Sequence, residues 1–189
     1  MKQLRKVASA IKRRLDMGQY RKRGAKNHYS GNLFDRFAGL ELVLPHAKDA
    51  TVLDFGCCEG LIAYEFARAG CSLVHGFDID GPLMQFATQL FRNVPVKSAF
   101  TQEDLSMSFD AFRRKHASVL LDRYDIVLFL GVYHHLENQT SPERLRGIVD
   151  GLLDRAGSYF VVRTGRLSAF EHQIFEKGFE FVAERPAEA

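Results

Sequence analysis

Short apolar runs alternate with amphipathic stretches along most of the chain, a pattern typical of strands and helices that follow one another in turn. The apolar runs predict strands at residues 52–55, 73–77, 96–100, 159–162 and 179–182, with the longest run at 124–136. Helical spacing predicts helices at residues 61–69, 82–92, 109–121, 142–153 and 167–177. An unbroken apolar strand is typical of a parallel sheet that is buried on both faces. We therefore predict a doubly wound α/β fold with helices on both faces and strand order 3-2-1-4-5, with the sixth strand beside the fifth.

Two further helices are expected before the first of these strands. Near the N-terminus, apolar residues at helical spacing predict a helix that ends at Gly18; they are Leu4, Val7, Ala8, Ile11 and Leu15. Ser30 or Asn32 can cap a second helix that runs through Leu44.

Residues 51–60 combine a strand, a glycine turn and a helix N-terminus. Gly56 permits a tight turn, and Gly60 lets the next helix begin close to whatever lies in that turn. Free backbone N–H groups and the helix dipole favour polar or anionic ligand groups there. The dinucleotide pattern G-x-G-x-x-G would need glycine at 56, 58 and 61, but Cys58 and Leu61 occupy two of these positions. The spacing therefore disfavours an NAD-dependent oxidoreductase.

The spacing Asp54-x-Gly56-Cys57-x-x-Gly60 instead resembles motif I of the class I S-adenosylmethionine (SAM) methyltransferases. The resemblance covers roughly residues 30–183 and implies a Rossmann-like fold, SAM as cofactor and methyl transfer as the activity. It further implies that Gly56, Cys57 and Gly60 receive the methionine part of SAM beside Asp54. Cys58 stands where the family commonly has a middle glycine, and this departure crowds the loop slightly.

Acidic residues follow the second and third strands, where the resemblance implies contacts with SAM. Asp78 ends a Gly-Phe-Asp sequence and matches the residue that binds the ribose, since a carboxylate accepts hydrogen bonds from two hydroxyls. Asp80 precedes Gly81-Pro82, and we expect it to cap the next helix rather than bind the cofactor. After the third strand, Asp104 matches the residue that accepts from the adenine amino group, with Glu103 as the alternative one position earlier. The charged residues of the following helix, Arg113 to His116, are expected to face solvent.

The fourth strand runs into the sequence Leu130-Gly131-Val132-Tyr133-His134-His135. By the resemblance, Leu130 and Gly131 wall the cofactor, and the three aromatic side chains that follow are the candidate catalytic residues beyond the carboxyl end of the strand. His134 or His135 can remove a proton from a methyl acceptor; the alternative is that one histidine packs inward and satisfies a backbone carbonyl. Two adjacent histidines with no third ligand do not indicate a metal site.

The sequence restricts the acceptor without identifying it. It lacks the Asn/Asp-Pro-Pro-Tyr tetrad of amino-directed nucleic-acid and protein-glutamine methyltransferases, and it lacks the Pro-Cys nucleophile of pyrimidine C5 methylation. We expect an oxygen or nitrogen acceptor on a small molecule or an RNA. The run at 130–134 is also similar, minus one residue, to a Leu-Gly-Val-x-Tyr-His run of a wobble-uridine transferase of tRNA. The alternative function is a non-catalytic module of the same fold that binds RNA or another protein.

Charge divides the chain unevenly. Residues 1–26 carry a net charge of +9 and the remainder −6, although the total is only +3. We therefore expect a basic N-terminal helix and loop at 1–26 and a SAM-binding methyltransferase domain at 27–189. The basic segment can contact nucleic acid, pack on the body or lie on a membrane surface. Because it contains none of the matched motifs, a chain without it is expected to fold and to bind SAM.

The helix before the first strand often folds over the methionine end of SAM in the family, which makes Tyr29, Phe34 and Arg36 lid candidates.

Three further expectations concern location and assembly. No apolar run is long enough to span a bilayer, and no apolar segment of a secretory signal follows the basic N-terminus. The three cysteines fit no zinc spacing, which favours reduced thiols and a cytoplasmic location. The family's seventh, antiparallel strand returns between the fifth and sixth, but few residues follow Val182, so we expect this strand to be short or missing. The sheet edge that remains is a place where two chains can pair as a homodimer.

Overall fold

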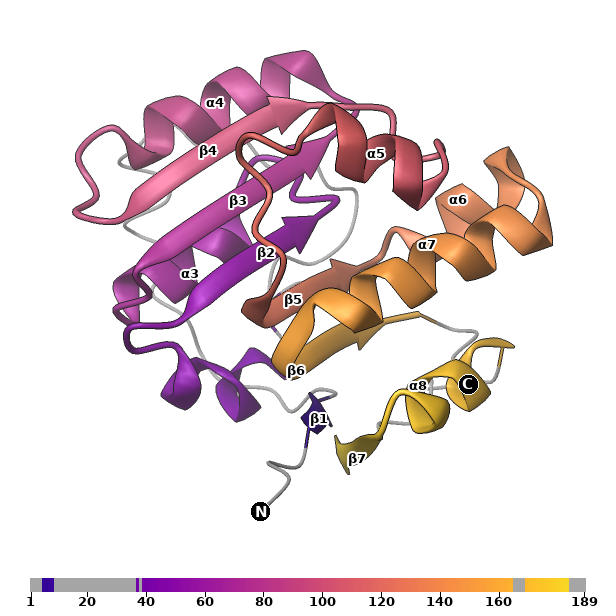
Figure 1. Ribbon diagram of the computed structural model, residues 1–189. Coiled ribbons are helices and arrows are strands. Elements are labelled where there is room, and N and C mark those ends of the chain that lie inside the picture. The colour runs from indigo at the N-terminus through magenta and orange to yellow at the C-terminus, as the bar shows by residue number, and fades with distance from the viewer. Residues whose placement is uncertain (1–4, 9–36, 38, 165–168, 184–189) are drawn as a thin grey trace.

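A seven-stranded parallel sheet forms the centre of the computed structural model, which describes residues 5–8, 37, 39–164 and 169–183. The strands are β1 (Arg5–Ala8), β2 (Thr51–Phe55), β3 (Leu73–Asp78), β4 (Lys97–Gln102), β5 (Tyr124–Leu130), β6 (Ala156–Arg163) and β7 (Phe179–Ala183). They are ordered β4-β3-β2-β5-β6-β1-β7, and every neighbouring pair is parallel (Figure 1). Strands β2 to β6 thus have the predicted order 3-2-1-4-5, and the predicted Rossmann-like α/β fold is confirmed.

Helices cover both faces of the sheet, as predicted. They are α3 (Leu61–Arg68), α4 (Gly81–Phe91), α5 (Phe109–Lys115), α6 (Tyr133–Gln139), α7 (Pro142–Arg155) and α8 (Glu171–Glu176). Alternate residues of β2 serve the two faces, because successive side chains of a strand point to opposite sides. Leu53 and Phe55 join a buried cluster with α5 and α7, whereas Val52 joins a second cluster with α3. Figure 1 shows α3 and α4 on one side of the sheet and α5 and α7 on the other.

Strand β1 corrects two predictions about the ends of the chain. Val7 pairs with Phe160 of β6 on one side and with Phe181 of β7 on the other. The predicted N-terminal helix is therefore wrong at residues 5–8, and its other apolar positions, Leu4, Ile11 and Leu15, lie outside the described residues. The sixth predicted strand, β7, is also not beside the fifth, β6, because β1 lies between them. Residues 5–8 belong to the sheet and so are not part of a separate basic segment.

The segment before β2 also differs from the expected helix. Phe37 is helical, but Gly39 has a φ of 90°, and two short 3-10 turns follow, η1 (Leu40–Leu42) and η2 (Leu44–His46). A helix through Leu44 is wrong because Gly39 leaves the right-handed region and Pro45 then begins a new turn. The capping candidates Ser30 and Asn32 and the lid candidates Tyr29, Phe34 and Arg36 lie outside the described residues.

No helix of the described residues is both long enough and apolar enough to cross a membrane. Cys57, Cys58 and Cys71 are free thiols.

Candidate functional site

A cavity of about 370 Å³ lies at the carboxyl ends of β2, β3, β5 and β6 and beside the segment that follows β4. Strand order reverses between β2 and β5, and ligands of open α/β sheets bind at such a switch point. Most of the predicted cofactor residues line this cavity: Asp54, Gly56, Cys57, Asp78, Asp104, Leu130 and Gly131. His134 and His135 line it too. Gly60 and Tyr133 are not among the residues that line it.

The two glycines of the loop after β2 allow neighbouring segments to pack closely. Gly56 has a φ of 90°, and a Cβ atom there would lie 2.0 Å from Cγ2 of Val132, so only glycine fits against the segment after β5. Gly60, with a φ of 75°, begins α3, and its own Cβ would lie 3.0 Å from Cβ of Ala87 in α4. Gly60 therefore brings two helices together rather than facing the cavity. Cys58, at the position of the family's middle glycine, has a φ of 50°, a backbone conformation that costs a side-chain-bearing residue about 1–2 kcal/mol.

Asp78 joins this loop to the end of β3. Its Oδ2 accepts a hydrogen bond from the backbone N–H of Cys58 at 2.8 Å, and its Oδ1 accepts from the N–H of Asp80 at 3.1 Å. Asp80 has a different role, because its Oδ1 accepts from the N–H of Leu83 at 2.9 Å and caps α4. The predicted cap at Asp80 is confirmed, and the structure places Asp78 at the cavity.

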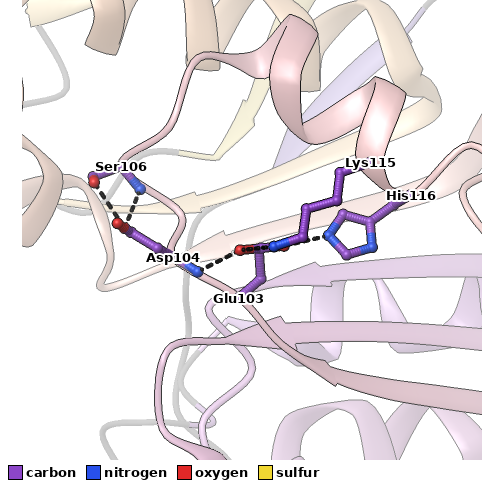
Figure 2. Close-up of polar contacts among 5 residues, drawn as sticks. All are labelled: Glu103, Asp104, Ser106, Lys115 and His116. Carbon is purple, nitrogen blue, oxygen red and sulfur yellow. Dashed lines mark hydrogen bonds and ion pairs between the residues drawn. The ribbon is translucent and has the colours of Figure 1, made fainter.

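The two acids after β4 point in different directions (Figure 2). Asp104 lines the cavity, and its Oδ1 accepts hydrogen bonds from Oγ of Ser106 at 2.7 Å and from the Ser106 N–H at 2.9 Å. These bonds lower the pKa of Asp104 although partial burial opposes them, so the carboxylate stays ionised and can accept from a ligand. Glu103 is buried and faces α5 instead.

Glu103 also explains why His116, at the end of α5, does not face solvent as the sequence predicted. His116 was expected to face solvent, but it is buried, and its Nε2 lies 2.6 Å from Oε2 of Glu103. Its ring contacts Phe77 and Phe112, each with ring centroids 4.9 Å from its own. The prediction was wrong because a buried carboxylate from another element draws this side chain inward, and a helical pattern does not contain that partner.

Helix α6 separates the three candidate catalytic residues. His134 and His135 are exposed, with ring centroids 3.9 Å apart, so neither packs inward. Burial and the charge of His135 lower the pKa of His134, while Glu137 partly opposes this shift. Tyr133 is only 6% exposed, and its ring packs on Phe170 with centroids 4.9 Å apart. Successive helical residues point about 100° apart, so Tyr133 faces the core while the histidines face the cavity.

Several residues that line the cavity were not candidates from the sequence, and four of them add notable polar or apolar groups. Arg163 ends β6, and it was detectable in principle because ligands bind at the carboxyl ends of strands. Gln139 ends α6, a helix that the apolar pattern did not predict. Ile79 and Leu105 add apolar surface beside Asp78 and Asp104. Ile79 is 58% exposed, so its apolar side chain is open to a ligand in the cavity.

Solved structures with a similar fold include WbdD, described as a bifunctional kinase-methyltransferase. Monomeric WbdD gives a TM-score of 0.56 at 15% identity, over 85% of this chain and 36% of that chain. A second WbdD structure gives 0.52 at 18% identity, over 65% of this chain and 28% of that chain. TehB from Haemophilus influenzae gives 0.48 at 16% identity, over 77% of this chain and 41% of that chain. At these identities the likeness concerns the fold alone, and this chain spans less than half the length of these proteins.

Comparison of the sequence with curated proteins gave no match. The sequence profile of a family described as "Methyltransferase domain" matches residues 21–164, well over half of the chain. The matched range contains the loop after β2, both acidic strand ends and the histidines of α6. The chain therefore belongs to this family of methyltransferase domains.

Proposed function

We propose that the cavity binds SAM and that the chain transfers its methyl group to an oxygen or nitrogen acceptor. One observation carries this proposal: carboxylates from β2, β3 and the segment after β4 converge on one cavity, in Asp54, Asp78 and Asp104. SAM offers such a site two ribose hydroxyls, an adenine amino group and a positively charged sulfonium. A dinucleotide would instead bring phosphate charges against three carboxylates, which is unfavourable.

The walls of the cavity suit the same ligand. Ile79 exposes its side chain beside Asp78, and stacking of an adenine ring on it would remove apolar surface from water. At Gly131 a Cβ atom would have no neighbour within 4 Å, so this backbone adjoins open space that a ligand can fill. A volume of about 370 Å³ also lies within the ordinary range for ligand pockets.

Each group of residues has a distinct task in the proposed reaction. SAM supplies an electrophilic methyl group on its sulfonium. Asp78 binds the ribose and Asp104 the adenine, while Gly56, Cys57, Leu130 and Gly131 surround the rest of the cofactor. The chain then needs chiefly to align the acceptor with the methyl group, and such alignment can supply on the order of 7–11 kcal/mol.

The acceptor side of the cavity lies at the ends of β5 and β6. His134, His135, Gln139 and Arg163 line it there, beyond the carboxylates along the sheet. The lowered pKa of His134 keeps its imidazole neutral at neutral pH, and a neutral imidazole can take a proton from an acceptor. We therefore propose His134 as the general base, with His135 beside it.

Isothermal titration with SAM and with NAD tests the cofactor. Binding of SAM but not NAD is expected, and binding of NAD alone would exclude the proposal. Turnover of labelled SAM with a set of small molecules and RNAs then identifies the acceptor. A chain that binds RNA but no SAM would instead be a non-catalytic binding module. Contact of RNA with the basic residues up to 26, a homodimer and a cytoplasmic location stay predictions.

A further inference from the structure

Two neighbouring carboxylates at the end of β4 are connected through the backbone (Figure 2). The Glu103 side chain is 4% exposed, and its Oε1 accepts a hydrogen bond from the backbone N–H of Asp104 at 2.9 Å. Asp104 itself faces the cavity. Glu103 thus holds the peptide group from which the Asp104 side chain extends.

Glu103 is itself held by two side chains at the end of α5. Nζ of Lys115 lies 2.7 Å from Oε2 of Glu103 and 3.0 Å from Oε1. Nε2 of His116 donates to the same Oε2 at 2.6 Å. The aromatic rings around His116 leave it little freedom to turn. Burial and two donors together give Glu103 a fixed position, which a lone surface acid would lack.

The Asp104 carboxylate has one oxygen engaged and one available. Both bonds from Ser106 go to Oδ1. Among the described residues, Oδ2 accepts no hydrogen bond. With the peptide fixed by Glu103 and Oδ1 fixed by Ser106, Oδ2 is the oxygen that can accept from a ligand in the cavity.

We propose that Glu103 is a positioning residue for base selection: held by Lys115 and His116, it fixes Asp104 so that Oδ2 accepts from the 6-amino group of adenine. The inference rests on the proposed use of the cavity for SAM. It goes further in assigning a role to a buried cluster that does not line the cavity. A 6-oxo base presents an acceptor where adenine presents its 6-amino donor, so Glu103 controls the preference for adenine and not only the overall affinity.

The test compares two product-like ligands, S-adenosylhomocysteine and S-inosylhomocysteine, which differ at position 6 of the base. Isothermal titration of the parent protein should show a preference for adenine on the order of tenfold or more, as expected for a hydrogen bond to a charged acceptor. Glu103→Gln keeps the shape of the side chain. In one orientation its amide NH₂ group faces the Asp104 N–H and Lys115, and in the other it faces Lys115 and His116, so it meets a donor either way. His116→Phe removes one donor while fitting the aromatic surroundings. Each variant should reduce the preference to about threefold or less.

Asp154→Asn is the matched control. It also changes an acid to its amide and breaks an ion pair with lysine, the Lys177 Nζ contact at 2.6 Å, but it does not line the cavity. Asp154→Asn should therefore prefer S-adenosylhomocysteine over S-inosylhomocysteine as strongly as the parent protein does.

A lower melting temperature with an unchanged preference in both variants would make Glu103 merely structural and overturn the inference. If Glu103→Gln does not fold, His116→Phe decides by the same criterion. A parent that binds neither ligand refutes the SAM site itself, whereas a parent that binds both equally refutes the contact between Asp104 and adenine, and the inference with it.

Discussion

Two carboxylates at the end of β3, Asp78 and Asp80, have different roles although they are only two positions apart in the sequence. Asp78 joins the loop after β2 to the end of β3 and lines the cavity, whereas Asp80 caps α4. The backbone hydrogen bonds of the two residues distinguish their tasks, and substitution can test the distinction.

We predict that Asp78→Asn weakens SAM binding by roughly 1.5–3 kcal/mol, because ribose hydroxyls lose a charged acceptor. Asparagine is preferable to alanine here, since its oxygen can still accept from the N–H of Cys58. Asp80→Ala should lower the free energy of unfolding by about 1 kcal/mol through the lost cap and leave affinity nearly unchanged. Titration calorimetry and urea unfolding measure the two effects. Loss of the cofactor in Asp80→Ala would show that the assignment is reversed.

For His134, we predict that His134→Gln lowers kcat roughly 10²–10⁴-fold while SAM affinity stays at the parent value. The parent kcat should fall as pH drops below the ordinary histidine pKa of about 6.5, since the pKa of His134 is lowered and its neutral form is needed. His135→Gln is the neighbouring control and should lose less activity. A larger loss in His135→Gln would move the base to that residue.

At the scale of whole elements, Glu103 connects the end of β4 to the end of α5 through Lys115 and His116. Burial disfavours its charge, but hydrogen bonds from Lys115, His116 and the Asp104 N–H, with the Lys115 charge, lower its pKa below the ordinary value. The folded protein therefore binds this proton less readily than the unfolded chain does. The stabilisation is complete above the ordinary glutamate pKa of about 4.3 and is lost as pH falls through the lowered value.

We predict that Glu103→Gln is less stable than the parent at pH 7 by about 1–3 kcal/mol and that this difference shrinks as pH falls below about 4. Urea unfolding of both proteins at a series of pH values measures it, and the shared carboxylates cancel in the comparison. A difference that stays constant down to pH 3 would show that the Glu103 charge contributes no stability.

At the scale of the whole molecule, β1 connects the two ends of the chain. It pairs with both β6 and β7, so without it these two strands would have no neighbour in common. The sequence suggested that a chain without residues 1–26 still folds and binds SAM. With β1 in the sheet, we instead expect such a chain to lose stability and to expose two strand edges.

A single substitution can test this with less disturbance. Val7→Pro removes a backbone donor from a strand with neighbours on both sides, and the neighbouring carbonyl that loses its partner costs about 1–3 kcal/mol. We predict a melting temperature several degrees lower, with SAM affinity retained because β1 does not line the cavity. Val7→Ile keeps the backbone donor and should have the melting temperature of the parent protein. An unchanged melting temperature in Val7→Pro would exclude a stabilising role for β1.

The sequence by itself determined the features that depend on neighbouring residues. Alternation of apolar runs and amphipathic stretches predicted the order of strands and helices from β2 onward, except for α6, whose residues extended the apolar run of β5. Asp80 before Gly81-Pro82 identified a helix cap, and acids after β3 and β4 indicated where a cofactor could bind, because strand ends in such a sheet share one edge.

Only the tertiary structure decided the features that depend on distant partners. Residues 5–8 form a strand because β6 and β7 lie on either side, although their local spacing suits a helix. Glu103 turns away from the cavity because Lys115 and His116 lie across from it, and Tyr133 turns inward because Phe170 covers it. Each of these choices is made by a contact between different elements of the fold, and periodicity along one segment contains no information about such a contact.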